Sequence, residues 1–243
     1  MTAKVHGVAP CTGVVLGHGG WSNPSDRGWV AELLRNDDLA VLAADLPSHH
    51  GLRAGRDDDV RAVEELIDRA ASPVVVASWS YGGAVVSDFE QSLPSVDHPV
   101  YVAWVPRPIA LVAGDEPPEL ELDLSHILFP DDATCVLDEE WFRTERAGLS
   151  FSPEVQTHVQ ANPRRAMTIN AFLSPPVGQA WAKVPTTIVL GRGDDLVPAP
   201  LQKWAQTHFP DVRVVEGNHF MPFIEPEIVA ATIQEALGKS ATI

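Results

Sequence analysis

The chain has 243 residues, 45% hydrophobic and 21% charged, the composition of a globular protein with a sizeable core. Its formal net charge of −16 repels phosphate backbones and anionic lipid, which argues against nucleic-acid and membrane partners. No apolar run is long enough to span a bilayer, and the N-terminus lacks the apolar core of a signal peptide, so we expect a cytoplasmic protein. Cys11 and Cys135 have no metal-site spacing and are expected to be reduced thiols.

Apolar runs alternate with amphipathic segments along the first hundred residues. Strands are predicted at 12–17, 39–47, 73–78 and 98–108, and helices at 29–36, 57–70 and 82–93. The pattern returns near the end, with strands at 186–191 and 212–217 and a helix at 226–238. Strands that are apolar throughout and alternate with helices predict an α/β fold with a mostly parallel, doubly wound sheet.

A different kind of sequence separates the two halves of this pattern. Residues 107–184 are rich in Pro, Asp and Glu, with short helical stretches around "EEWFRTERAG" and "SPEVQTHVQ". We interpret this segment as a small helical cap inserted over the carboxyl edge of the sheet. Residues 1–243 are therefore predicted to form a single domain that carries the insertion.

The stretch "ASWSYGGA" (77–84) connects the valine run of a predicted strand directly to a predicted helix. So sharp a turn brings the backbone close to itself, and the residues two before and two after its apex must be small, as Ser78 and Gly82 are. The apex residue, Ser80, is then strained, with its hydroxyl thrust out above the sheet. This pattern favours a nucleophilic serine; the alternative is a plain junction in which Ser80 caps the helix.

Two later loops carry the base and the acid that a nucleophilic serine requires. The loop "GRGDDLVP" (191–198) contains Asp194 and Asp195, and "EGNHFMPF" (216–223) contains His219. Each loop follows a predicted strand, so the sheet would bring these side chains to the same edge as Ser80. The residues therefore predict a Ser–His–Asp triad.

The loop "LGHGGW" (16–21) follows the first predicted strand and has little side chain to obstruct its backbone N–H groups. The N–H groups of Gly20 and Tyr81 are the candidates for an oxyanion hole. The alternative, a phosphate cradle built from Gly17, Gly19 and Gly20, is disfavoured because the spacing matches no phosphate-binding motif and no lysine is nearby.

Together, the motifs "VVLGHGGW", "AADLPSHHG", "ASWSYGGA", "GRGDDLVP" and "GNHFMPFIEPE" resemble those of the α/β-hydrolase superfamily over nearly the whole chain apart from the insertion. Within it, the chain is similar to the compact branch of plant methylesterases, hydroxynitrile lyases and small bacterial carboxylesterases. The resemblance implies a cofactor-free enzyme in which Ser80 is the nucleophile, His219 the general base and then acid, and Asp194 the orienting carboxylate, with Asp195 as the fallback.

The activity implied by the resemblance is hydrolysis of a small carboxylic ester or lactone through an acyl-enzyme on Ser80. Phe220 stands beside His219 where hydroxynitrile lyases carry a lysine, which counts against lyase chemistry. Dehalogenases and epoxide hydrolases of this fold use aspartate at the elbow, which Ser80 disfavours. Hydrolysis of C–C bonds, a lyase step, a cofactor-free oxygenase, or a binding module without turnover are the alternatives.

The remaining expectations concern the pocket and its partners. The candidate substrate-binding residues are Trp21, Trp79, Trp104, Phe129, Trp141 and Phe220. His49 and His50 could suggest a metal site with neighbouring aspartates, but we interpret them as loop residues and 57–59 as a solvated helix start, and expect no metal. The partner is expected to be a small-molecule substrate, and a homodimer is compatible with the sequence.

Overall fold

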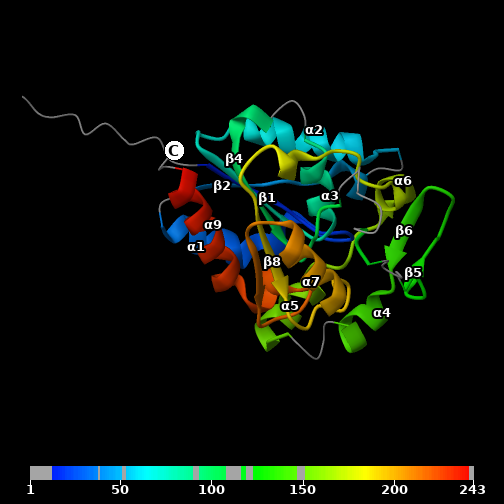
Figure 1. The fold of residues 1–243 in the computed structure, drawn as a ribbon. Helices are drawn as coiled ribbons and strands as arrows, with labels where there is room; N and C mark the ends of the chain where they lie inside the picture. Colours follow the sequence, from blue (N-terminus) through cyan, green and yellow to red (C-terminus); the bar gives the residue numbers. More distant parts are fainter. Residues whose placement is uncertain are drawn as a thin grey trace, which may run out of the picture.

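The computed structural model describes residues 13–37, 39–50, 53–89, 93–107, 116–118, 123–146 and 151–240. Its centre is a six-stranded sheet of order β2-β1-β3-β4-β8-β9, in which every neighbouring pair is parallel (Figure 1). The strands are β1 (Gly13–Gly17), β2 (Ala40–Ala43), β3 (Val74–Trp79), β4 (Val96–Val102), β8 (Thr187–Gly191) and β9 (Val212–Val215). The predicted parallel sheet is confirmed.

Helices cover both faces of this sheet. The helices are α1 (Gly28–Asn36), α2 (Arg56–Ile67), α3 (Tyr81–Ser87), α7 (Ala199–His208), α8 (Met221–Ile224) and α9 (Pro226–Ser240). Side chains of β1 alternate between two buried clusters: Val14 and Leu16 pack with α1 and α9, whereas Val15 packs with α2, α3 and α7. Because both faces are covered, these strands are apolar at nearly every position.

The chain departs from the predicted elements around the sheet: β2 and β4 end four and six residues before the predicted ends, at Ala43 and Val102, and the short helix α8 was not predicted. Helix α3 ends at Ser87, earlier than predicted, and 90–92 lie outside the described residues. Helix α7 was not predicted, although Leu201, Trp204 and Ala205 form a buried stripe along it. None of the helices among the described residues has the length and apolar character needed to cross a membrane.

Between β4 and β8 the described residues form short helices together with a second, three-stranded sheet of order β5-β6-β7. The elements are β5 (Ile127–Leu128), β6 (Thr134–Leu137), α4 (Glu139–Trp141), a π-helical turn (Phe142–Arg146), α5 (Pro153–Ala161), β7 (Met167–Thr168) and α6 (Ile169–Leu173). The predicted helical segment thus also contains short strands, which were not predicted from the sequence because two to four residues are too few to show a strand period.

A buried ion cluster ties α5 and the residues after it to the 3₁₀ turn Pro24–Arg27, which precedes α1. The Asp26 carboxylate is fully buried and accepts hydrogen bonds from Arg164 Nη1 at 2.7 Å, His158 Nε2 at 3.0 Å and Ser22 Oγ at 2.5 Å. Burial opposes ionisation of Asp26, but the bonds from His158 and Arg164 outweigh it and hold the pKa of the carboxyl below its usual range.

We expect Asp26→Asn to lower the free energy of unfolding by about 3–5 kcal/mol, because it leaves the buried guanidinium of Arg164 without its counter-ion. Since the folded-state pKa of Asp26 is depressed, its contribution to stability should be complete above about pH 4 and decline as the pH falls further. Urea unfolding at several pH values measures both effects. Glu216→Gln, at an exposed ion pair with Arg192, is the control, with an expected change below about 0.5 kcal/mol. Equal losses for the two variants would contradict the prediction.

Candidate active site

Ser80 occupies the turn between β3 and α3, with φ 52° and ψ −122°. A non-glycine residue with positive φ is strained and persists only where its surroundings hold it. Here the Ser80 N–H donates to the carbonyl of Val102 on β4 at 3.0 Å, and the Ser80 carbonyl accepts from the N–H of Gly83 at 2.7 Å. The side chain of Ser80 is half-buried. The sharp turn predicted from "ASWSYGGA" is therefore present.

The glycines that follow Ser80 are required by close neighbours. A Cβ on Gly82 would lie 2.8 Å from the carbonyl oxygen of His18, in the loop after β1. A Cβ on Gly83 would lie 2.3 Å from the indole of Trp104, which follows β4. The two glycines thus let α3 start against the loops that follow the neighbouring strands.

His219 and Asp194 lie beside Ser80 in a continuous chain of hydrogen bonds. His219 Nε2 is 2.8 Å from Ser80 Oγ, and His219 Nδ1 is 2.9 Å from Asp194 Oδ2. Asp194 Oδ1 also accepts from the N–H groups of Leu196 and Val197 at 2.9 and 3.1 Å. Because these bonds fix the carboxylate, Asp194 can orient the imidazole with its Nδ1–H toward the acid and Nε2 toward Ser80.

Close packing of two loops brings Asp194 and His219 together. A Cβ on Gly191 would lie 2.8 Å from the backbone nitrogen of Asn218, and the N–H of Gly193 donates to the Gly217 carbonyl at 2.8 Å. The loop after β8 thus lies against the loop after β9. Asp194 is 2% exposed, whereas the side chain of Asp195 is exposed to solvent. His219 Nδ1 donates to Asp194, the residue preferred over Asp195 from the sequence.

The loop after β1 faces the start of α3. A Cβ on Gly19 would lie 3.3 Å from Ser80 Cβ, and one on Gly20 would lie 3.8 Å from Tyr81 Cβ. In the part of the chain that the structure describes, neither the Gly20 N–H nor the Tyr81 N–H has a hydrogen-bond acceptor. Gly20 and Tyr81 thus lie close to each other beside Ser80, where the two residues of an oxyanion hole are required.

The side chain of Tyr81 is anchored by a buried carboxylate. Its hydroxyl donates to Asp59 Oδ2 at 2.5 Å, and Asp59 Oδ1 accepts from the N–H of Ser48 at 2.8 Å. Burial raises the pKa of Asp59 above its ordinary value. The interpretation of Asp59 as part of a solvated helix start was wrong, because it lies wholly inside the protein and holds the first turn of α3 in place.

Of the six aromatic residues predicted to bind substrate, two lie in the core. Trp79 and Phe220 are 3% and 6% exposed, and Trp79 Nε1 donates to the carbonyl of His219 at 2.7 Å. These positions favour support of the histidine loop over contact with a substrate. Sequence reasoning did not identify Met167, whose sulfur would lie 3.4 Å from a Cβ on Gly20.

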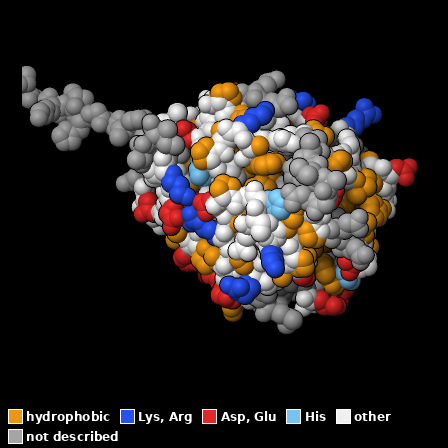
Figure 2. Space-filling model, viewed as in Figure 1, with side chains coloured by type: hydrophobic (Ala, Val, Ile, Leu, Met, Phe, Trp, Pro, Cys, Tyr) orange, Lys and Arg blue, Asp and Glu red, His pale blue; other side chains and the backbone are white. Residues whose placement is uncertain are grey.

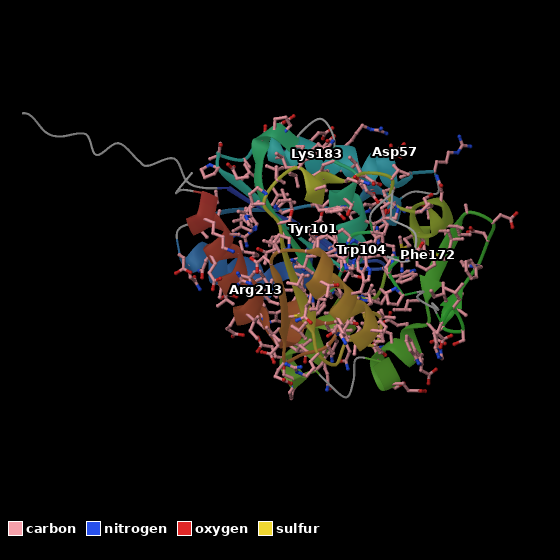
Figure 3. The ribbon with its side chains drawn as sticks, viewed as in Figure 1. Asp57, Tyr101, Trp104, Phe172, Lys183 and Arg213 are labelled. Carbon is pink, nitrogen blue, oxygen red and sulfur yellow. The ribbon has the colours of Figure 1, made fainter. Side chains whose placement is uncertain are left out.

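The other four aromatic residues are more accessible. Trp104 is half-buried against α3, near the centre of the molecule in Figure 3, and Trp21 packs against Phe172 with ring centroids 4.9 Å apart. Trp141 stacks on His126, and Phe129 is 48% exposed. Figure 2 shows hydrophobic side chains gathered on the side of the molecule where Figure 1 draws β5, β6 and α6. The six residues therefore do not form one pocket.

From the sequence, His49 and His50 were considered as metal ligands and no metal was expected. Among the described residues, no three His, Cys, Asp or Glu side chains are arranged to hold a metal ion. The Nδ1 atom of His49 instead lies 3.0 Å from Ser48 Oγ.

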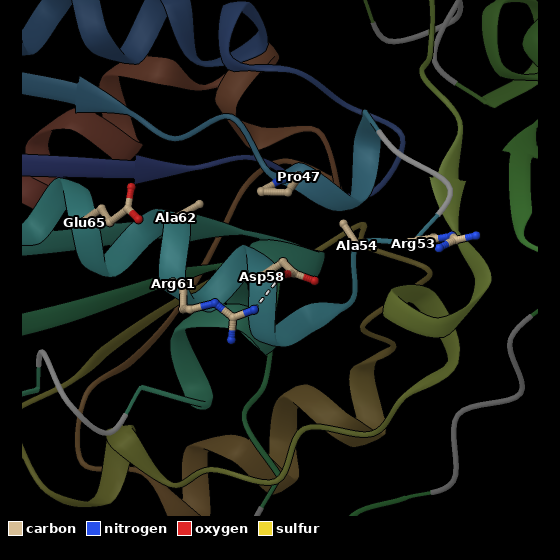
Figure 4. A pocket seen from close by; sticks show the side chains of 7 residues that line it. All are labelled: Pro47, Arg53, Ala54, Asp58, Arg61, Ala62 and Glu65. Atoms are coloured by element: carbon tan, nitrogen blue, oxygen red, sulfur yellow. Dashed lines mark hydrogen bonds and ion pairs between the residues drawn. The ribbon is translucent and has the colours of Figure 1, made fainter.

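A surface hollow beside α2 is lined partly by Arg53, Asp58 and Arg61, the last two forming an ion pair (Figure 4). None of the predicted site residues lines this hollow.

A serine on a strand–turn–helix junction, with an acid and a histidine supplied in that order by loops after later strands of a parallel sheet, defines the α/β-hydrolase fold. The family comparison gives the same answer: the model of the Alpha/beta hydrolase family matches residues 14–232. The chain belongs to that family. A search of curated proteins finds no match.

Solved structures with the same fold match nearly the whole chain. A pyrethroid hydrolase from Sphingobium faniae JZ-2 is 22% identical with a TM-score of 0.71, covering 96% of this chain and 100% of its own. A methylesterase from Arabidopsis is 18% identical with a TM-score of 0.69, covering 93% and 99%. Methylketone synthase I from tomato is 13% identical with a TM-score of 0.69, covering 95% and 99%. At these identities the similarity shows the fold alone.

Proposed function

We propose that the protein is a serine hydrolase that cleaves a small carboxylic ester through an acyl-enzyme on Ser80. The observation that carries the proposal is the chain of hydrogen bonds from Asp194 through His219 to Ser80 Oγ, with distances of 2.9 and 2.8 Å. Such a chain activates a hydroxyl that is otherwise a weak nucleophile. The triad residues and the two oxyanion-hole residues assigned from the sequence keep the same roles in this proposal, whereas Trp79 and Phe220 do not stay in it as substrate-binding residues.

In the acylation step, His219 Nε2 takes the proton of Ser80 as the Oγ attacks the ester carbonyl. The carbonyl oxygen becomes an oxyanion that the N–H groups of Gly20 and Tyr81 stabilise. His219 then gives its proton to the leaving alcohol, and the C–O bond breaks to leave an ester on Ser80. Throughout the step Asp194 stays ionised and holds the imidazole in the required tautomer.

In the deacylation step, water replaces the alcohol and His219 again acts as base. The attacking water gives a proton to Nε2, a second tetrahedral intermediate forms on the same two N–H groups, and its collapse returns the proton to Ser80 Oγ. The products are an alcohol and a carboxylic acid. A lactone would follow the same steps and yield one hydroxy acid.

The similar structures support an ester substrate, since a pyrethroid hydrolase, a methylesterase and polyneuridine aldehyde esterase are among them. The fold also occurs in methylketone synthase I, so C–C bond chemistry is tested alongside ester hydrolysis. A β-diketone assayed beside an aryl ester separates the two, because only the ester has an alkoxide or phenoxide leaving group.

A fluorophosphonate probe is expected to label the protein on Ser80, located by peptide mass spectrometry, and to abolish turnover of short p-nitrophenyl esters in proportion to labelling. The reason is that the probe phosphonylates a serine only where a base and an oxyanion hole activate it. A panel of esters and lactones of graded size then defines the substrate class. A folded protein that is neither labelled nor active on the panel would overturn the proposal.

A further inference from the structure

Arg165, which lies between α5 and β7, is bonded to the loop that follows β1. Its backbone N–H donates to the carbonyl of Trp21 at 2.9 Å, and its Nε donates to the carbonyl of Ser22 at 2.8 Å. These acceptors are the two residues directly after Gly20. Trp21 itself has φ 55°, a strained value for a non-glycine residue that has to be held by neighbours.

The far end of the same guanidinium reaches the loop after β2 and the start of the β1 loop. Nη1 donates to Asp45 Oδ1 at 2.8 Å, and Nη2 lies 3.1 Å from His18 Nε2. All three nitrogens of the side chain are therefore used, and the side chain is 21% exposed. A planar fork of donors that bonds in several directions is a property of arginine that lysine lacks.

The bond from Arg165 also selects the tautomer of His18. His18 Nε2 lies within hydrogen-bond distance of two donors, Arg165 Nη2 and the N–H of Leu46 at 3.2 Å, whereas the Asp45 carboxylate is 3.8 Å away, so Nε2 carries no proton. Burial lowers the pKa of His18, which agrees with a neutral ring. The single ring proton is then on Nδ1, which donates to the carbonyl of Gly19 at 2.9 Å.

The Gly19 carbonyl controls the direction of the oxyanion donor. In a trans peptide the C=O and the N–H of the next residue lie in one plane and point in opposite directions. A hydrogen bond that fixes the Gly19 carbonyl therefore fixes the N–H of Gly20 as well. The side chain of Arg165 acts on this peptide from both sides, through His18 before it and through Ser22 after it, whose own N–H donates to the Gly19 carbonyl at 3.3 Å.

We propose that Arg165 is a positioning residue for the oxyanion hole: its hydrogen bonds to the 18–22 loop hold the Gly20 N–H in the direction that meets the developing negative charge. This inference rests on the proposed function. It assigns Arg165 an effect on transition-state stabilisation and none on the binding of the ground-state ester, because its side-chain bonds to His18 and Ser22 act on the direction of the Gly20 N–H.

The test compares Arg165→Met and Arg165→Lys with Arg213→Met. Arg213 is a matched control, since it is 27% exposed and paired with Asp211 and Glu235. It lies on β9, at the opposite edge of the sheet from β2 and far from Phe172 beside Trp21 (Figure 3). Melting temperature and circular dichroism report the fold of each variant.

With p-nitrophenyl acetate, kcat of both Arg165 variants is expected to fall by about 10- to 100-fold with little change in KM. The loss is of this size because one oxyanion donor is misdirected rather than removed. The inhibition constant of an aryl trifluoromethyl ketone, which forms a tetrahedral adduct, should rise by the same factor. Lysine should not restore the rate, because the directions of the bonds matter more than the charge. Arg213→Met should keep wild-type kcat even where its melting temperature falls.

Two results would overturn the inference. The first is a wild-type kcat in either folded Arg165 variant. The second is an equal loss of kcat in Arg213→Met when its melting temperature falls by the same amount, because such a loss would indicate a general effect of stability. If Arg165→Met does not fold, Arg165→Lys and its inhibition constant decide the question. Failure of the proposed function is distinct: the wild-type protein itself would then show neither labelling nor ester turnover.

Discussion

Replacing Ser80 with alanine is expected to lower kcat for a p-nitrophenyl ester by about 10⁶-fold, the scale of loss when a triad loses its nucleophile. The reason is that the Ser80 hydroxyl, bonded to His219 Nε2 at 2.8 Å, is the group placed to form the acyl-enzyme. The fold should be unaffected, because no described residue other than His219 bonds to the hydroxyl of Ser80. Steady-state kinetics and circular dichroism measure both quantities.

The double variant Ser80→Ala with His219→Ala is the control for a shared mechanism. If the two side chains act as one unit, the double variant should be no slower than either single variant, because each change alone already disables the unit. Losses that multiply would indicate two independent contributions and would contradict the triad. The triad would also be contradicted if Ser80→Ala kept more than about 1% of the wild-type kcat, because a nucleophile elsewhere in the protein would then carry the reaction.

The sheet and most of its helices could be predicted because their local patterns agree with the tertiary structure. The valines of β1 and β3 form continuous apolar runs, and the two faces of the sheet bury every one of them. Helix α7 was missed for a physical reason. Its buried stripe includes Gln202, whose Nε2 donates to the carbonyls of Gly191 and Val197, and this polar residue interrupts the apolar period from which a helix is predicted.

The Ser–His–Asp set could be located because each member follows a strand, and parallel topology gathers such positions at one edge. The residues that support this set could not be located from the sequence, because their roles depend on partners that are distant along the chain. Asp59 stands in a run of three aspartates at a helix start, and only the contact with Tyr81 distinguishes it as buried. Arg165 follows a second arginine in "NPRR", and no local signal predicts which bonds either makes. The burial of a tryptophan also depends on residues that are distant in sequence: Trp79 is 3% exposed and Trp104 is half-buried, and the residues around them in the sequence do not predict this.

Asp194→Asn is expected to lower kcat by about 10⁴-fold while leaving the site nearly superimposable on the wild type. The amide oxygen of asparagine can still accept from the N–H groups of Leu196 and Val197, as Asp194 Oδ1 does. Its NH₂ group then faces His219 Nδ1 in place of Oδ2. A donor at that position requires Nδ1 to be the acceptor, which moves the ring proton to Nε2.

With its proton on Nε2, the imidazole points a donor at Ser80 Oγ and cannot take the serine proton. The neighbouring change Asp195→Asn removes one charge of the same sign from the same loop but leaves the bond between Asp194 and His219 intact, so it should keep kcat within about threefold of wild type. Kinetics of the two variants, measured with the rate of fluorophosphonate labelling, separate the residues. Because the labelling reaction also needs an unprotonated Nε2, its rate should fall with kcat in Asp194→Asn alone, and a fall in Asp195→Asn instead would assign the orienting carboxylate to Asp195.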